Sequence, residues 1–198
     1  MTYNPLNFDN LIGAPGLSDK MLKDHFTLYQ GYVTNTNKCA DLLMALFKDG
    51  KTATPEFAEV KRRFGWEFNG MRLHELYFGN MHREATKLDE KSAFAKAATA
   101  SFGSIDKLKE ALTAVGTMRG IGWAVLYYDS VGEKMFVNWV NEHDVGHLAG
   151  CAPLLIMDVF EHAYMTDYQL KRADYIKAFV NAINWPVVAK RFDQAKKI

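Results

Sequence analysis

Six histidines are the residues of this 198-residue chain whose type points most directly to chemistry. Neutral imidazole is the commonest metal ligand in proteins and also serves as an acid or base near neutral pH. His25 and His74 each fall on the apolar face of a long helical pattern, so two antiparallel helices could present both to one ion. The alternative is that each is a core histidine whose ring nitrogens are satisfied by neighbouring groups.

A carboxylate and a third imidazole follow near the C-terminal end. Asp158 ends a short apolar run, and a buried carboxylate needs a partner. A metal ion is one such partner, and His162 is close enough in sequence to reach the same ion. One carboxylate with two or three histidines is typical of redox iron sites rather than of Cys-rich structural zinc sites. The alternative is a helix N-cap aspartate followed by a surface histidine.

Helical periodicity predicts how the first two histidines are positioned. After an extended arm, a helix begins at Ser18 and ends at Asp49-Gly50, where capping residues stand. A short helix over 56–63 and a second long helix over 68–83 follow. Two long helices joined by a modest loop predict an antiparallel hairpin.

The second half of the chain alternates between helical and strand patterns. The expected elements are helices over 90–101 and 104–117, strands over 123–128, 135–140 and 154–157, and helices over 167–181 and 185–195. The fold class is therefore α+β: an N-terminal antiparallel helical hairpin, then a domain with a small three-stranded antiparallel sheet and flanking helices. We expect domains over 1–88 and 89–198, with the metal site between them.

Composition excludes several classes of partner. Twenty-four basic and 23 acidic side chains give a net charge of +1 without a block of like charge, so neither nucleic acid nor an anionic membrane is expected. No apolar run approaches the roughly 20 residues of a membrane helix. Cys39 and Cys151 do not make a disulfide framework. With no signal-peptide pattern over 1–10, a cytoplasmic protein is expected.

Residues 158–164, Asp-Val-Phe-Glu-His-Ala-Tyr, resemble the D-x-W-E-H-A-Y signature of the iron/manganese superoxide dismutases. Other segments similar to the family's motifs occur in the same order: 17–25, 68–78, 120–126, 171–176 and 184–185. The resemblance implies conversion of superoxide, a small anion, to dioxygen and hydrogen peroxide by redox cycling of one iron or manganese ion per subunit. The ligands that it implies are His25, His74, Asp158 and His162, with a solvent molecule as the fifth.

The resemblance also implies roles around the metal. Tyr32 matches the family's gateway tyrosine, and Trp123 and Tyr77 match aromatic walls, whereas Phe160 stands where tryptophan is usual. A glutamine that hydrogen-bonds the bound solvent in many members has no counterpart at Gly70.

His143 resembles a histidine that some iron-using members place beside the bound solvent, so we expect it there and favour iron over manganese. His147 is less suited, and His82 is expected to be exposed at a helix end. Arg172 matches an arginine that lines the substrate funnel and would steer the anion. Glu161, His162 and Tyr164 match residues of a homodimer interface; a tetramer stays open.

The first helix departs from the family pattern. His25 and Tyr32 are seven residues apart, where eight is usual. At about 100° per residue, seven positions return to within about 20° of the same face, whereas eight need a π-bulge. We therefore expect a regular helix here, and we reject the register that puts Asp24 at the ligand position.

The same deletion removes a histidine of the family's hydrogen-bond relay, so that Tyr29 or Gln30 occupies its region, and a funnel lysine is missing too. Two alternatives to a dismutase follow. One is a non-catalytic or repurposed metal-binding homologue with an altered proton relay; the other has no catalytic metal and uses the histidines in its core.

Overall fold

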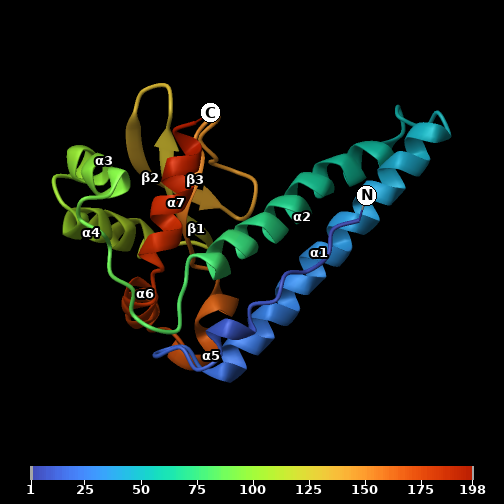
Figure 1. The fold of residues 1–198 in the computed structure, drawn as a ribbon. Coiled ribbons are helices and arrows are strands. Elements are labelled where there is room, and N and C mark those ends of the chain that lie inside the picture. The colour runs from blue at the N-terminus through green and yellow to red at the C-terminus, as the bar shows by residue number, and fades with distance from the viewer. Residues whose placement is uncertain (1, 198) are drawn as a thin grey trace.

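The computed structural model describes residues 2–197, and two long helices dominate its N-terminal half. α1 (Asp19–Lys48) and α2 (Pro55–Gly79) form an antiparallel hairpin that projects from the rest of the molecule (Figure 1). The hydroxyl of Ser18 accepts a hydrogen bond from the N–H of Met21 (3.1 Å), which confirms the predicted cap. The chain before α1 lies along the hairpin as an extended arm, held where the side chain of Asn37 exchanges two hydrogen bonds with the backbone of Tyr3.

Helix α2 corrects one prediction. Residues 55–79 form one continuous helix, not a short helix over 56–63 and a long one over 68–83. The glycine between the two predicted helices, Gly65, lowers helix stability by only about 1 kcal/mol, and packing against α1 outweighs that. The helix ends at Gly79 because the Asn80 side chain bonds the backbone N–H and C=O of Ile156 and turns the chain toward the sheet.

The C-terminal half contains the predicted antiparallel sheet and its flanking helices, which confirms the α+β class. Its elements are α3 (Ala93–Phe102), α4 (Ile105–Gly116), β1 (Gly122–Asp129), β2 (Lys134–Asn141), β3 (Ala152–Asp158), α5 (Met165–Tyr168), α6 (Arg172–Asn181) and α7 (Trp185–Ala195). The strand order is β2-β1-β3. The single helix predicted over 167–181 is wrong, because Gln169 has a φ of 50° and breaks the helix between α5 and α6.

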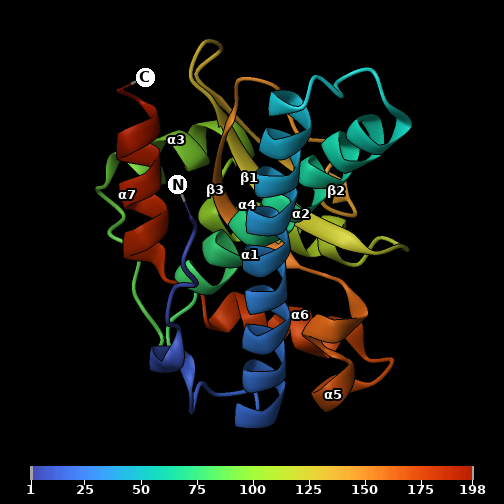
Figure 2. The ribbon, with the colours of Figure 1, turned by 90° about the vertical axis from the view of Figure 1, so that its right-hand side faces the viewer.

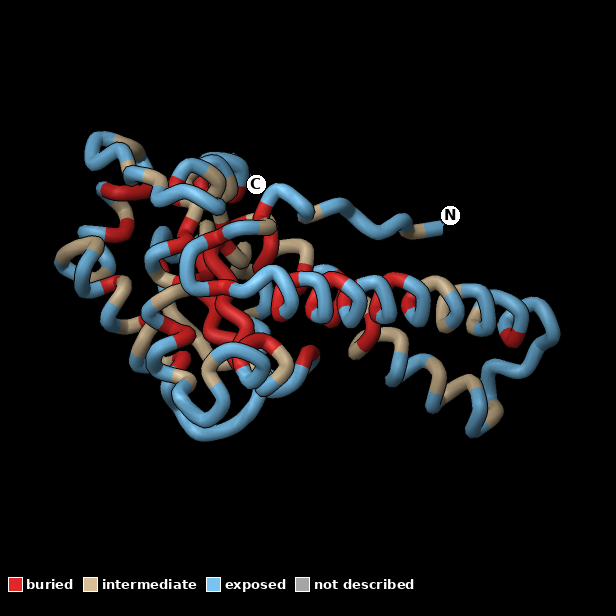
Figure 3. Tube along the Cα trace, turned by 90° about the horizontal axis from the view of Figure 1, so that it is seen from below, coloured by how far each residue is buried: buried red, intermediate tan, exposed pale blue. Residues whose placement is uncertain are grey.

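The core lies where the base of the hairpin meets the sheet. In Figure 3 buried residues concentrate there, while the far end of the hairpin is mostly exposed. Seen from the side, the first turns of α1 lie beside α5 (Figure 2). The hairpin and the C-terminal half therefore share one hydrophobic cluster, which includes Phe78 of α2, Trp123 of β1 and Ile176 of α6.

Helix α1 is α-helical without a π turn over all of its described residues, 19–48, as predicted. His25 and Tyr32 are both buried on the face toward α2, whereas Asp24 is exposed and pairs with Lys20. None of the helices within residues 2–197 combines the length and apolar character that crossing a membrane requires.

Candidate metal centre

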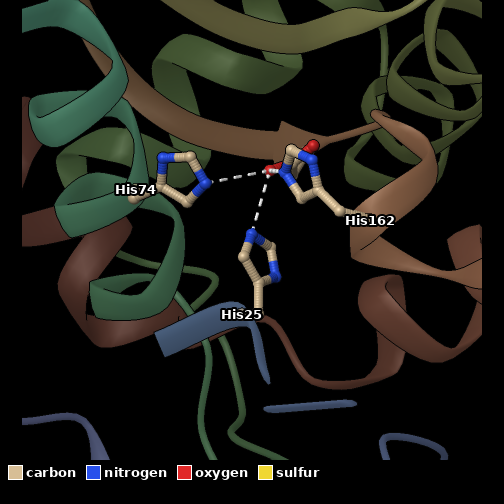
Figure 4. Close-up of side chains that lie close together, drawn as sticks. His25, His74 and His162 are labelled. Atoms are coloured by element: carbon tan, nitrogen blue, oxygen red, sulfur yellow. Dashed lines mark hydrogen bonds and ion pairs between the residues drawn. The ribbon is translucent and has the colours of Figure 1, made fainter. Parts of the chain in front are cut away.

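Four side chains from both halves of the molecule meet at the base of the hairpin. His25 comes from α1 and His74 from α2, while Asp158 is the last residue of β3. His162 lies in the short 3-10 turn Glu161–Ala163 that follows β3. The two helices and the strand end thus position these side chains from three directions, as Figure 4 shows for the histidines.

The three imidazoles converge on one carboxylate oxygen. The distances from Asp158 Oδ2 to Nε2 are 3.3 Å for His25, 3.6 Å for His74 and 3.2 Å for His162 (Figure 4). One nitrogen or oxygen atom from each of the four residues lies within 4.8 Å of all the others. Ligands about 2.0–2.2 Å from a common ion are themselves roughly 3–3.6 Å apart, so the cluster has the dimensions of a metal site.

The hydrogen bonding of the histidines also fits a cation. His74 Nδ1 lies 2.6 Å from the carbonyl of Gly70, which places the ring proton on Nδ1 and leaves the Nε2 lone pair directed at Asp158. Within residues 2–197, the buried Nε2 atoms of His25 and His74 have no hydrogen-bond partner. A buried acceptor facing a carboxylate oxygen is unfavourable unless a cation lies between them.

Burial and charge set the protonation of the cluster before any ion binds. Burial lowers the pKa of His25, which the Asp158 carboxylate only partly offsets, and burial lowers the pKa of His74 well below its usual range. Burial alone would raise the pKa of Asp158, but His162 and His25 outweigh it and hold that pKa well below its usual range. His25, His74 and Asp158 are therefore in the forms that bind metal at neutral pH.

His143 and Tyr32 form a buried pair beside this cluster. The indole N–H of Trp123 donates to His143 Nδ1 (3.1 Å), so the ring proton is assigned to Nε2, which donates to the Tyr32 hydroxyl at 2.8 Å. Burial lowers the pKa of His143 to about 4 and raises the pKa of Tyr32 well above its usual range. Both groups are therefore uncharged at neutral pH, and Tyr32 keeps its phenol proton.

Aromatic rings enclose the cluster. Trp123 meets His74 edge-on at 5.0 Å between ring centroids, and its backbone lies opposite Asp158 in the β1–β3 register. Phe160 stacks on both His143 (4.9 Å) and His162 (5.1 Å). Tyr77 lies against Trp123 at 6.3 Å. These apolar walls lower the local dielectric and strengthen electrostatic interactions inside the site.

Comparison with known proteins identifies the family. A model of the C-terminal domain of iron/manganese superoxide dismutases matches residues 90–191. An iron superoxide dismutase of Aquifex pyrophilus is 36% identical over 187 residues, which cover 92% of this chain and 87% of the relative. The chain belongs to the iron/manganese superoxide dismutases.

Other relatives within this superoxide dismutase family carry either metal in their names. An iron superoxide dismutase of Saccharolobus solfataricus is 32% identical over 194 residues, covering 96% of this chain and 91% of the relative. A manganese superoxide dismutase of Haloferax volcanii is 32% identical over 201 residues, covering 100% of this chain and 99% of the relative. The family and the histidine–aspartate cluster together give iron or manganese as the cofactor.

The contacts of Arg172 are with a loop backbone and with Tyr164, not with the four side chains of the cluster. Its guanidinium donates to the carbonyl of Met118 (2.7 Å), reaches the carbonyls of Gly116 and Gly120, and lies over the ring of Tyr164. These contacts anchor the loop between α4 and β1. The steering role expected of Arg172 stays a prediction.

The residues near the missing relay histidine are also placed. Tyr29 is buried, and its hydroxyl donates to Glu75 Oε1 (3.0 Å) and accepts from the N–H of Leu6 (3.0 Å). Gln30 is exposed. Tyr29 thus anchors the N-terminal arm, and its ring lies 6.4 Å from that of His74.

The two remaining histidines lie outside the cluster. His82 is half-buried just after α2, not fully exposed, because its backbone N–H bonds the carbonyl of Ala182. His147 accepts from the Tyr127 hydroxyl at Nδ1 (2.7 Å) and donates from Nε2 to the carbonyl of His143 (2.9 Å). His147 therefore supports the backbone that carries His143.

Sequence reasoning missed one residue that touches the His143–Tyr32 pair. The ring of Trp66 lies 4.4 Å from His143 and 5.6 Å from Tyr32. Its spacing of four residues from Gly70 puts it beside Gly70 on one face of α2, which was the available signal.

Proposed function

We propose that the protein is a superoxide dismutase in which His25, His74, Asp158 and His162 hold one iron or manganese ion, at the junction of residues 1–88 with 89–198. The observation that carries this proposal is the convergence of three Nε2 atoms on one carboxylate oxygen, with two of them lacking a partner in the described chain. Iron is preferred over manganese because a histidine stands at position 143.

A bound iron or manganese ion supplies a one-electron redox couple that converts two superoxide ions and two protons to dioxygen and hydrogen peroxide. The chain's own residues set the conditions for this chemistry. Asp158 contributes one negative charge and the neutral histidines none, so a divalent or trivalent ion keeps a net positive charge that attracts a small anion. Trp123 and Phe160 line the site with apolar surface.

Tyr32 and His143 are proposed to hold and move the protons. The Nε2–H of His143 occupies one lone pair of the Tyr32 oxygen, so the phenol proton of Tyr32 points elsewhere and is available to a peroxide product. Trp123 fixes the His143 tautomer through its indole N–H. Arg172 is proposed to steer superoxide by its charge, together with the anchoring contacts described above.

A homodimer through Glu161, His162 and Tyr164 is proposed as the active assembly. The side chain of His162 is 29% exposed, whereas those of His25, His74 and Asp158 are at most 2% exposed, so the cluster is open at this side. Glu161 is exposed beside it, while Tyr164 is buried against Tyr175 and contributes less surface. Sedimentation of the wild type and Glu161→Ala tests this: a monomeric wild type at micromolar concentration contradicts the dimer.

A cytoplasmic location is also proposed, supported by the state of the cysteines. Cys39 and Cys151 are both free thiols, which is usual in reducing compartments. Fractionation of the source cells tests the location, and recovery of the protein outside the cytoplasm contradicts it.

The proposed activity is tested by metal analysis of the purified protein together with superoxide consumption. One iron or manganese per chain with dismutation supports it. Bound metal without dismutation favours the alternative, a repurposed metal-binding homologue. The supporting observation is that the Tyr29 hydroxyl is bonded to Glu75 and Leu6 and that Gln30 is exposed. Absence of bound metal after reconstitution contradicts both.

A further inference from the structure

The loop that carries His143 joins β2 to β3 and is fastened at both ends. Asn141 and Val145 exchange two backbone hydrogen bonds (2.7 and 3.3 Å) and close a tight turn. Between them Glu142 has a φ of 49°, in the left-handed region that non-glycine residues rarely adopt. Such a conformation persists when surrounding contacts determine it.

Glu142 makes a contact that reaches across to the hairpin. Its Oε2 accepts a hydrogen bond from the indole N–H of Trp66 on α2 at 3.1 Å. The carboxylate of Glu142 therefore faces α2, while the next side chain, His143, is fully buried and hydrogen-bonded to Tyr32. The left-handed residue lets consecutive side chains serve these two separate contacts.

Trp66 is itself held in place from its other side. The guanidinium of Arg63 lies 4.1 Å from the ring centroid of Trp66, within the range of cation–π attraction. Arg63 in turn pairs with the buried carboxylate of Glu67 at 2.7 Å. Four side chains thus form one connected group, which we call the Trp66 brace: Arg63, Trp66, Glu67 and Glu142.

We propose that Trp66 and Glu142 are positioning residues that hold the His143 imidazole against Tyr32. The proposal rests on the proposed dismutase function. The brace ties the His143 loop to α2, the helix that also carries His74, so the proton-donating pair and the metal cluster keep one geometry. The ring of Trp66 covers His143 and Tyr32 and keeps water from competing for their hydrogen bond.

Loosening the brace is expected to lower kcat more than kcat/KM. In the proposed function Tyr32 and His143 deliver protons after superoxide has bound, whereas encounter of the anion with the site does not use the pair. Loss of one hydrogen bond corresponds to about two- to tenfold in the population of the positioned loop. We expect kcat per bound metal to fall by that factor and kcat/KM to change little.

The test compares four variants of the full-length, metal-loaded enzyme. Trp66→Phe keeps an aromatic ring, though a smaller one, and removes the N–H, whereas Glu142→Ala removes the acceptor. Each is expected to lower kcat per metal about two- to tenfold. Glu142→Gln keeps an oxygen acceptor and is expected to restore most of the rate lost in Glu142→Ala. The matched control is Trp185→Phe, because Trp185 stands at the start of α7, where it packs on Phe94 of α3. This control is expected to leave kcat unchanged.

Hydrogen–deuterium exchange gives a readout that does not depend on activity. Peptides covering 141–148 are expected to exchange about two- to tenfold faster in Trp66→Phe and Glu142→Ala, and at the wild-type rate in Trp185→Phe. The proposal is overturned if both brace variants keep the wild-type exchange rate and kcat. It is also overturned if kcat and kcat/KM fall equally and metal is lost, because that result shows a general structural defect. An inactive metal-loaded wild type contradicts the proposed function instead, and accelerated exchange still supports the brace.

Discussion

Two glycines of helix α2 allow the packing of Tyr32 to be tested with matched substitutions. A Cβ atom on Gly70 would lie 2.5 Å from Cδ1 and 2.7 Å from Cε1 of Tyr32, whereas a Cβ on Gly65 has no atom within 4 Å. Since ordinary contact begins near 3.4 Å, the Tyr32 ring must move by about 1 Å to accept the methyl group that Gly70→Ala adds. Trp66 and His74 pack on that ring and oppose the movement.

The free energies of unfolding of the two variants should therefore differ in sign or size. Replacing an interior helix glycine by alanine stabilises a helix by about 1 kcal/mol, so Gly65→Ala is expected to gain about that much. Gly70→Ala gains the same amount but loses about 1–3 kcal/mol through overpacking. We expect Gly70→Ala to be about 1–3 kcal/mol less stable than Gly65→Ala.

Urea unfolding of the metal-free proteins measures this difference, because bound metal would add its own stabilisation. Superoxide consumption per bound metal is measured on the loaded proteins. Gly70→Ala should retain its metal and lose activity, because Tyr32 is displaced from His143, whereas Gly65→Ala keeps both. If Gly70→Ala matches Gly65→Ala in stability and in activity per metal, the packing argument for Tyr32 is refuted.

Three further changes test other contacts. Burial lowers the pKa of folded His143 to about 4, so between pH 6.5 and 4 this histidine binds more protons in the unfolded chain than in the folded one, and the free energy of unfolding falls as pH falls. His143→Gln should remove about 2–3 kcal/mol of this loss, measured by urea unfolding at several pH values. An equal dependence on pH in the wild type and the variant contradicts the prediction. Tyr29→Phe should destabilise the metal-free protein by about 1–2 kcal/mol without lowering activity per metal, and lower activity would place Tyr29 in the proton relay. His74→Ala should weaken metal affinity by more than the roughly 10–100-fold that is typical of losing a hydrogen-bond partner of a ligand. Gln30→Ala, at an exposed position, should leave the affinity unchanged, and chelator competition measures both.

Three of the candidate ligands could be chosen from the sequence because each stands in a local pattern of apolar residues. His25 and His74 fall on helical apolar faces, and Asp158 ends an apolar strand. The seven-residue spacing from His25 to Tyr32 also predicted a regular α1, which the structure confirms. These features depend on periodicity and on the burial cost of a carboxylate, which act within a few residues of chain.

Features set by tertiary contacts were not predictable in the same way. The continuity of α2 through Gly65 depends on packing against α1, and the break at Gln169 depends on a left-handed conformation that its residue type does not favour. The hydrogen bond from Trp66 to Glu142 joins residues 76 positions apart. No local pattern marks such a pair.

The most direct test of the central claim is to locate the metal in a crystal of the loaded protein by anomalous scattering. We predict one iron or manganese ion about 2.0–2.2 Å from Nε2 of each of the three histidines and from Oδ2 of Asp158. An ion bound elsewhere, with His25 and His74 keeping their Nε2 atoms free of metal in fully loaded and active protein, would contradict the account.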